Sequence, residues 1–360
     1  MAQLLSIQAA RGFAANLVVL SHLSIVESKY TTGDVLPACT FYGIAGVDLF
    51  FVLSGFIMVA VAGHYTGPVD FLWRRATRIY PTYWLLSLPL VALAIVAPSF
   101  INSSVQTPIS LWRSFFLIPD TTVPLLAVGW TLVHELYFYL VFSIFLALRI
   151  PILVGVVGWG VILLLIVATF PDQLAIFPLL RVATSPLTVE FMMGLTVGLL
   201  WTRRCAAGAI LAGVVGLAGL MLSIVYIAPI LSLSTNPHLD GWRVVIFGLP
   251  SALLVYTITG LERLRPLLRP KTLMVALGDW SYSTYLVHVL VISAVGRMLF
   301  LFAPNGGVIA SVTLIATGLI AANLVGAGVH TLFERPVLNW LHKFGARRLR
   351  VTNENGHAKV

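Results

Sequence analysis

The stretch QAARGFAANLVVLSHLSIV, residues 8–26, decides how the rest of the chain is interpreted. It is an apolar run of helix length that carries Arg11 near its start and His22 near its end. At a rise of about 1.5 Å and a turn of about 100° per residue, the two lie roughly 16 Å apart along a helix and about 20° apart around it. Both side chains are therefore predicted to face the same side of one helix at different depths.

Composition places this helix in a membrane. The 360 residues are 59% hydrophobic and only 10% charged, with a mean hydropathy of +0.97, whereas an average soluble domain has about 25% charged residues. Ionisable groups inside a bilayer are tolerated mainly where they face the interior of the helix bundle or a wet cavity. Arg11 and His22 are thus predicted to mark a path through the protein.

Apolar segments long enough to cross a bilayer follow one another along the chain, so the sequence predicts an all-α polytopic membrane protein with ten transmembrane helices. We assign residues 1–340 to this membrane domain and residues 341–360 to a short basic tail. The ten predicted spans are 8–26, 44–62, 81–97, 127–148, 152–170, 187–201, 207–230, 244–259, 282–302 and 308–333.

The basic residues predict which side of the membrane each loop occupies. An even number of spans puts both termini on one side; with that side cytoplasmic, inner segments hold sixteen Lys and Arg and outer loops hold four. This excess is typical of cytoplasmic loops. We therefore expect both termini in the cytoplasm and interpret the net charge of +9 as a topology signal, not as a nucleic-acid surface. The four outer residues are Lys29, Arg113, Arg181 and Arg243.

Three local features complete the expected organisation. The outer segment 98–128 contains an amphipathic piece at 111–118, which we expect to be a short interfacial helix where substrate could enter. Cys39 and Cys205 fall on opposite sides of the membrane and are not expected to form a disulfide. Gly194 and Gly198 have the small-xxx-small spacing of a close helix contact.

Asp48 is a candidate partner for His22. The first span runs outward and the second inward, so His22 and Asp48 lie at similar depths near the outer ends of their helices. A carboxylate at that level could orient the imidazole and favour the imidazolium that forms when the ring accepts a proton as a general base. The alternative is that Asp48 only caps a helix or forms a pair near the interface.

Glu135 is the candidate for a channel through the middle of the membrane. It follows His134, and adjacent helical residues point about 100° apart, so only one of them can face a cavity squarely. The carboxylate is the costlier to bury, which favours Glu135; the alternative is a salt bridge to Arg11 or Arg78. His288 lies on a polar helix face and is expected to be a hydrogen-bonded interior histidine.

Arg75 and Arg78 are predicted to form a basic clamp in the inner loop before residue 79. Their spacing of three places them on one side of a helical turn, and guanidinium groups match phosphate oxygens. The clamp would suit a phosphate-bearing cytosolic ligand, although topology and anionic lipid also account for arginines here. The sequence shows neither metal ligands at short spacing nor a phosphate-binding glycine loop, so no metal is expected.

These residues stand in motifs that resemble those of one family. Arg11 and His22 have an Arg/Lys-x10-His spacing, and Arg75 and Arg78 have an Arg-x-x-Arg spacing. The other motifs are GVDLFFVLSGF at 46–56, IYP at 79–81, WTLVHELYFY at 130–139, YSTYLVH at 282–288 and FERP at 333–336. Together they resemble the acyltransferase-3 family of bacterial integral-membrane O-acyltransferases, whose members typically have a ten-helix membrane domain.

The resemblance implies transfer of an acetyl group from cytosolic acetyl-CoA to a hydroxyl of an extracytoplasmic or lipid-linked polysaccharide. The acetyl-CoA donor, the sugar acceptor and membrane lipid are then the expected partners, in the bacterial inner membrane. The single-domain form resembles the exopolysaccharide O-acetyltransferases most, although this last step is an analogy between folds.

Under this interpretation His22 is catalytic, either as a general base or as a brief carrier of the acetyl group. Asp48 and Glu135 are the other catalytic candidates. The residues expected to bind the donor or to line its channel are Arg11, Ser54, Arg75, Arg78 and Tyr137. The rival interpretation is a transporter or flippase that uses the buried His, Glu and Arg for coupling.

Overall fold

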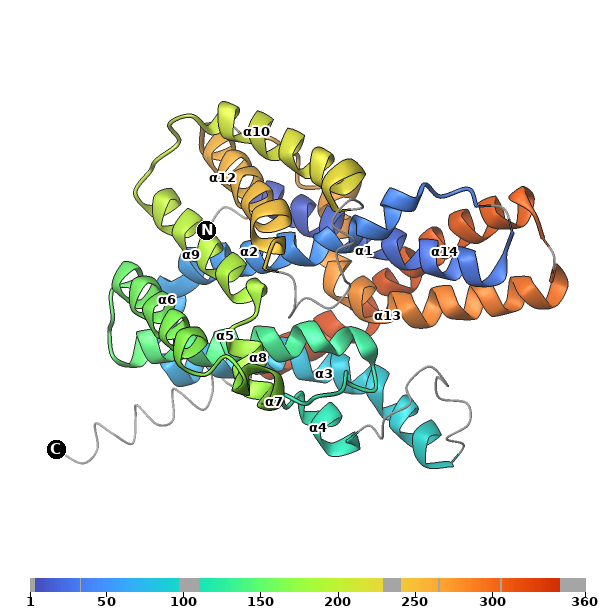
Figure 1. Ribbon diagram of the computed structural model, residues 1–360, viewed down its shortest axis with the longest axis horizontal. Coiled ribbons are helices and arrows are strands. Elements are labelled where there is room, and N and C mark those ends of the chain that lie inside the picture. The colour runs from blue at the N-terminus through green and yellow to red at the C-terminus, as the bar shows by residue number, and fades with distance from the viewer. Residues whose placement is uncertain are drawn as a thin grey trace.

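A computed structural model of the protein describes residues 4–32, 34–96, 110–228, 241–264, 266–304 and 306–343. Within these ranges the chain is helical and contains no strand. Helices α1, α2, α13 and α14 run roughly along the long axis of the molecule in Figure 1, and part of α1, α13 and α14 extends as an arm on the right. The predicted all-α architecture is confirmed.

The longer helices are α1 (Leu5–Tyr30), α2 (Ala45–Val61), α3 (Pro68–Val96), α5 (Trp130–Ala147), α6 (Ile152–Thr169), α9 (Pro186–Thr202), α10 (Ala209–Leu222), α12 (Leu249–Leu264), α13 (Leu273–Phe302) and α14 (Val308–Val329). The short ones are α4 (Leu111–Phe116), α7 (Gln173–Ile176) and α8 (Pro178–Ala183). Tight 3₁₀ turns occupy Ala38–Ile44, Ala62–His64 and Ala127–Gly129, and wider π turns occupy Ser223–Ile227, Val244–Gly248 and His330–Glu334.

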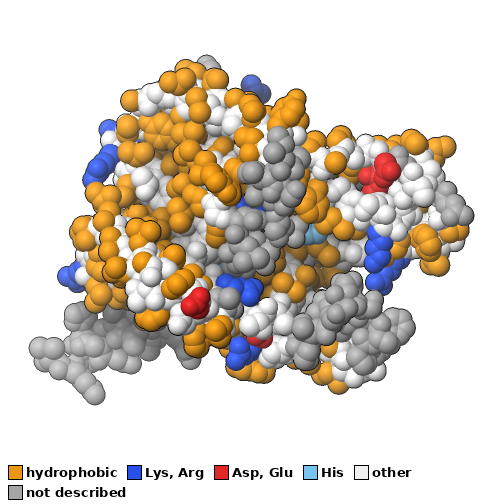
Figure 2. Space-filling model, in the orientation of Figure 1, with side chains coloured by type: hydrophobic (Ala, Val, Ile, Leu, Met, Phe, Trp, Pro, Cys, Tyr) orange, Lys and Arg blue, Asp and Glu red, His pale blue; other side chains and the backbone are white. Residues whose placement is uncertain are grey.

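Nine helical segments in the described ranges are long and apolar enough to cross a membrane. The remaining predicted span, 187–201, corresponds to α9, an apolar helix of 17 residues. Figure 2 shows apolar side chains over much of the visible surface, as lipid-facing helices require. The protein is therefore a multi-pass membrane protein.

Several predicted boundaries are wrong. Helix α3 begins at Pro68 and not at residue 81, so Arg75 and Arg78 lie on a helix and not in a loop. The predicted start was placed at Pro81 because proline is typical of a first helical turn. Proline is also tolerated inside transmembrane helices, and Pro81 lies inside α3. Helix α13 begins at Leu273, and helical structure continues past Glu334 as far as residue 343.

Two predicted segments lie partly outside the described residues. Of the outer segment 98–128, residues 97–109 are not described; α4 occupies 111–116, within the predicted amphipathic piece. Of the predicted tail, only residues 341–343 are described. Cys39 and Cys205 are free thiols.

Glycines let the central helices approach closely. A Cβ on Gly278 of α13 would meet the Gln8 carbonyl of α1, and a Cβ on Gly194 of α9 would meet the Val52 carbonyl of α2. A Cβ on Gly198, one turn further along α9, would lie 2.6 Å from Cβ of Val59. The predicted close contact at Gly194 and Gly198 is confirmed, and it holds α9 against α2.

Candidate active site

A cavity of about 70 Å³ lies among α1, α2, α3, α5 and α13. Four of the eight predicted site residues line it, namely Arg11, Ser54, Arg78 and Glu135. The remaining lining is mainly apolar and aromatic and includes Phe50, Phe51, Tyr282 and Tyr285. We call this the central cavity; the four predicted residues that line it come from four different helices, α1, α2, α3 and α5.

Glu135 faces the central cavity through hydrogen bonds and not through an ion pair. The Ser54 hydroxyl donates to Oε1 of Glu135 over 3.5 Å, and the Tyr139 hydroxyl donates to the same oxygen in a short contact. No ion pair joins Glu135 to Arg11 or Arg78 in the described part of the chain. The carboxylate and the two guanidinium groups are thus gathered around one space, where their charges can act on a ligand.

Tyr137 does not line the central cavity, contrary to the prediction. Its hydroxyl accepts a hydrogen bond of 3.2 Å from Nε1 of Trp159 on α6. Residues four apart share a helix face and residues two apart do not. This is why Tyr139, and not Tyr137, contacts Glu135.

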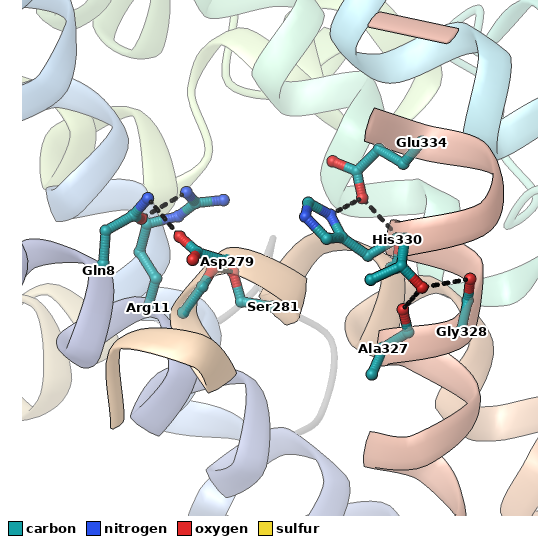
Figure 3. A network of polar contacts seen from close by, with 11 residues as sticks. Gln8, Arg11, Asp279, Ser281, Ala327, Gly328, His330 and Glu334 are labelled. Carbon is teal, nitrogen blue, oxygen red and sulfur yellow. Dashed lines mark hydrogen bonds and ion pairs between the residues drawn. The ribbon is translucent and has the colours of Figure 1, made fainter. Parts of the chain in front are cut away.

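Arg11 is held by a chain of side chains at the crossing of α1 and α13. Its Nη1 donates to Oε1 of Gln8 over 3.0 Å, and Nε2 of Gln8 donates to Oδ1 of Asp279 over 3.1 Å. Figure 3 shows the Gln8 amide joined by dashed lines to both Arg11 and Asp279. The contact fixes one end of the guanidinium and leaves the rest available to the cavity.

Glu334, from the FERP motif, lies in the helical segment that follows α14. Its carboxylate connects this segment to α13. Its Oε2 accepts from the Ser283 hydroxyl over 2.6 Å and from Nδ1 of His330 over 3.0 Å, and the latter contact is drawn in Figure 3. The motif therefore has a structural role close to the site, which sequence reasoning had not assigned.

A second cavity of about 350 Å³, the Arg75 pocket, lies at the end of the bundle where α3 begins. Arg78 lines both this pocket and the central cavity, so it links the two. Arg75 points among the rings of Tyr65, Phe71 and Tyr139, each centred 5.7 Å from its guanidinium carbon. The residues that line the pocket are Val61, His64, Tyr65, Arg74, Arg75, Arg78, Leu338 and His342.

The charge of the Arg75 pocket suits an anion. No carboxylate is among its described lining residues. Arg74 is paired with Asp70 over 2.8 Å, whereas Arg75 and Arg78 form no ion pair in the described ranges. Nη2 of Arg75 instead donates to the Tyr65 hydroxyl in a short contact. The structure therefore brings the two predicted clamp arginines together in one pocket.

A third cavity, of about 580 Å³, lies toward the other end of α1 and is lined by residues of α1, α3 and α13. His22 lines it, and we call it the His22 cavity. Tyr285 lines the central cavity, and its ring centre lies 5.7 Å from that of His288, which in turn contacts His22. A layer only two aromatic rings thick thus lies between the central cavity and His22.

The hydrogen bonds around His22 assign its tautomer. Nδ1 of His22 lies 3.0 Å from the Val18 carbonyl, and Nδ1 of His288 lies 2.6 Å from the Tyr285 carbonyl. A carbonyl oxygen only accepts, so in the neutral rings both Nδ1 atoms carry the proton. Nε2 of His288, 3.5 Å from Nδ1 of His22, is then an acceptor, and Nε2 of His22 keeps its lone pair. His22 therefore has the form that a general base or nucleophile needs.

Asp48 does not contact His22, so the predicted pairing is wrong. Its two oxygens accept from Nε and Nη2 of Arg243 over 3.2 and 2.5 Å. Arg243 was predicted in an outer loop, but it is only 1% exposed, at the start of the π turn before α12. A buried carboxylate is stable only beside a compensating charge, and the guanidinium fork supplies it.

Glu190 of α9 completes this buried cluster. It is fully buried, interacts electrostatically with both Asp48 and Arg243, and packs against Gly248. Glu190 lies in the predicted span 187–201, and it was assigned no role from the sequence. The cluster joins α2, α9 and the turn before α12, and we interpret it as part of the framework that supports the site.

A basic pocket, a cavity with buried charged groups and an imidazole beyond it, all within one membrane bundle, fit a membrane-embedded transferase. Residues 4–331 match the model of the acyltransferase-3 family, described as an acyltransferase domain. The chain belongs to this family and is a membrane O-acyltransferase. No group of metal-binding side chains occurs in the part of the chain that the structure describes.

Two characterised proteins are similar to most of the chain. The exopolysaccharide production protein ExoZ of Rhizobium meliloti is 32% identical over 311 residues, which cover 82% of this chain and 90% of the relative. The acyltransferase MdmB of Streptomyces mycarofaciens is 25% identical over 383 aligned positions, which cover 95% of this chain and 93% of the relative. No solved structure matches the chain.

Proposed function

We propose that the protein is an acetyl-CoA-dependent O-acetyltransferase of the bacterial inner membrane, which acetylates a hydroxyl of an extracytoplasmic or lipid-linked polysaccharide. The observation that carries this proposal is the arrangement along α1: Arg11 lines a cavity that Arg78 links to a basic pocket, and His22 lines a cavity toward the other end. The name of the relative ExoZ supports an exopolysaccharide as the acceptor class.

The Arg75 pocket would bind the nucleotide end of the donor. Arg75 and Arg78 would pair with its phosphates, because planar guanidinium groups bind phosphate oxygens through two hydrogen bonds. The pantetheine arm would run through the central cavity past Arg11, Ser54 and Glu135. Arg11 and His22 are about 16 Å apart along α1, a length that an extended arm can span.

His22 would activate the acceptor through Nε2, the nitrogen left without a proton. As a general base, it takes the proton of the sugar hydroxyl while the sugar oxygen attacks the thioester carbonyl. The carbon–sulfur bond breaks, the ester bond forms, and the proton leaves on the thiol of CoA. If His22 instead carries the acetyl group first, the same nitrogen forms the intermediate and the net change is identical.

His288, rather than Asp48, would hold His22 in its reactive form. The Nδ1–H of His22 donates to the Val18 carbonyl at 3.0 Å and is shared with Nε2 of His288 at 3.5 Å, so both acceptors oppose rotation of the ring and the change of tautomer. Asp48 is bound to Arg243, and we assign it no step in proton transfer. Glu135 and Arg11 would provide charges around the thioester and its developing oxyanion.

Purified protein in liposomes, supplied with radiolabelled acetyl-CoA and the de-O-acetylated surface glycan of the source bacterium, would test this function. We expect label in the glycan and release of CoA with wild type, and neither with His22→Ala. Ser28→Ala is the control on α1, because Ser28 is exposed and bonds only within its own helix. Full transfer by His22→Ala would refute the role of His22, and a transporter would release no CoA.

A further inference from the structure

The His22 cavity is positively charged. Lys29 and Arg297 both line it, one from α1 and the other from α13, and both side chains are exposed. Among the described residues that line it, none is an aspartate or a glutamate. Figure 2 shows basic side chains on the arm formed by parts of α1, α13 and α14. The described lining of the His22 cavity thus contains two cations and no carboxylate.

Two of the basic residues that were expected on the outer side are paired with carboxylates, whereas in the described part of the chain Lys29 and Arg297 are not. Arg181 also forms no ion pair in the described ranges, but it does not line the cavity. Arg113 lies 3.5 Å from Asp120, and Arg243 is paired with Asp48 inside the bundle. Neither Lys29 nor Arg297 belongs to an ion pair in the described ranges. Topology does not account for them either, because basic residues concentrate on the cytoplasmic side and α1 is expected to end outside.

The geometry relates the charges to the reacting group. Lys29 is seven residues after His22 on the same helix, about 10 Å further along it and about 20° around it. Ser293 and Arg297 are four apart on α13 and line the same cavity. A ligand whose hydroxyl reaches His22 would therefore have an anionic group about two helical turns away, a separation that one or two sugar rings can bridge.

We infer that the acceptor is anionic and that Lys29 and Arg297 bind its carboxylate or phosphate while His22 acts on a nearby hydroxyl. The inference rests on the proposed function and specifies its acceptor. The anionic group comes either from an acidic sugar or substituent of the glycan or from the phosphates of a lipid-linked sugar. Both offer the same oxygens to the two cations, and the experiment distinguishes them.

The test uses membranes of the source bacterium, because these contain the natural acceptor. The gene for the protein is first deleted from this bacterium, so that only the introduced variant is active. Full-length wild type and variants are expressed there, and transfer from labelled acetyl-CoA is measured at several salt concentrations. The variants are the double substitution Lys29→Gln with Arg297→Gln, the charge-preserving Lys29→Arg with Arg297→Lys, and Arg181→Gln as a cation that does not line the cavity.

We expect the double glutamine variant to need about tenfold more acceptor for half-maximal transfer. Each lost ion pair between a cation and the acceptor is exposed to solvent and should account for roughly threefold of this change. Its requirement for acetyl-CoA should not change, and its transfer should lose the decline with salt that wild type shows. The charge-preserving variant and Arg181→Gln should behave like wild type. A double glutamine variant with wild-type acceptor requirement and salt dependence would overturn the inference, whereas loss of transfer in His22→Ala would still uphold the proposed function.

The source of the anion follows from treated acceptors. Isolated, lipid-free glycan is offered with its carboxylates intact or chemically reduced, and lipid-linked sugar is offered in parallel. If the acidic glycan carries the anion, reduction removes the advantage of wild type over the double variant. If lipid phosphate carries it, only the lipid-linked sugar shows that advantage. An equal response of both enzymes to every acceptor would contradict an anionic subsite.

Discussion

Replacing Arg243 tests whether the buried cluster is part of the supporting framework. Arg243 is 1% exposed and Asp48 is fully buried, and Glu190 lies beside them. Arg243→Leu would leave these two buried carboxyl groups without their cation, which costs about 3–5 kcal/mol when one partner of a buried pair is removed. At roughly 2 °C per kcal/mol for a large domain, the midpoint of thermal denaturation should fall by about 6–10 °C.

The assay is thermal denaturation of purified protein in detergent, with Arg203→Leu as the control because Arg203 is exposed at the end of α9. Combining Arg243→Met with Asp48→Leu should recover much of the lost stability, since an apolar pair can replace a buried ion pair. Arg243→Leu with wild-type stability, or a double variant no better than the single one, would refute the reasoning.

Three further predictions concern the site and its helices. His288→Leu should lower kcat by about 10- to 100-fold and leave KM for acetyl-CoA unchanged, because part of the general-base contribution is lost. A rise in KM as large as the fall in kcat would contradict the proposal that His288 acts only by positioning His22. Tyr65→Phe should raise KM for acetyl-CoA about fivefold, because Arg75 loses one hydrogen bond, and unchanged donor affinity in a binding assay would exclude this. Gly194→Leu should destabilise the protein by about 1–3 kcal/mol or more through overpacking against α2. Gly158→Ala is the control, because a Cβ at Gly158 would meet no atom of another element within 4 Å. It should be neutral or stabilising by up to about 1 kcal/mol.

The sequence predicted the helices well because hydrophobic runs of bilayer length are a strong signal. It also placed Arg11 and His22 on one side of α1, and both line cavities. The start of α3 was missed because Pro81 is compatible both with a first turn and with the interior of a transmembrane helix.

The partners of buried charges were harder to predict. Topology gives the depth of a residue but not the direction in which it points, so Asp48 was matched to His22 although it faces Arg243. That arginine is 195 residues away in the sequence and lies beside an apolar run. The contact of Glu135 with Tyr139 was also missed, because Tyr137 was chosen from the sequence. The spacing of four between Glu135 and Tyr139 on one helix could have indicated the contact, since Tyr137, two residues from Glu135, lies on a different face.

The account depends most on the path from the Arg75 pocket to His22, and a structure of the protein with CoA bound would test it most directly. We predict phosphates of CoA against Arg75 and Arg78, the pantetheine arm in the central cavity beside Arg11, and the thiol directed toward Nε2 of His22. A complex in which CoA occupies the His22 cavity from the Lys29 end, or in which its thiol points away from His22, would contradict the account.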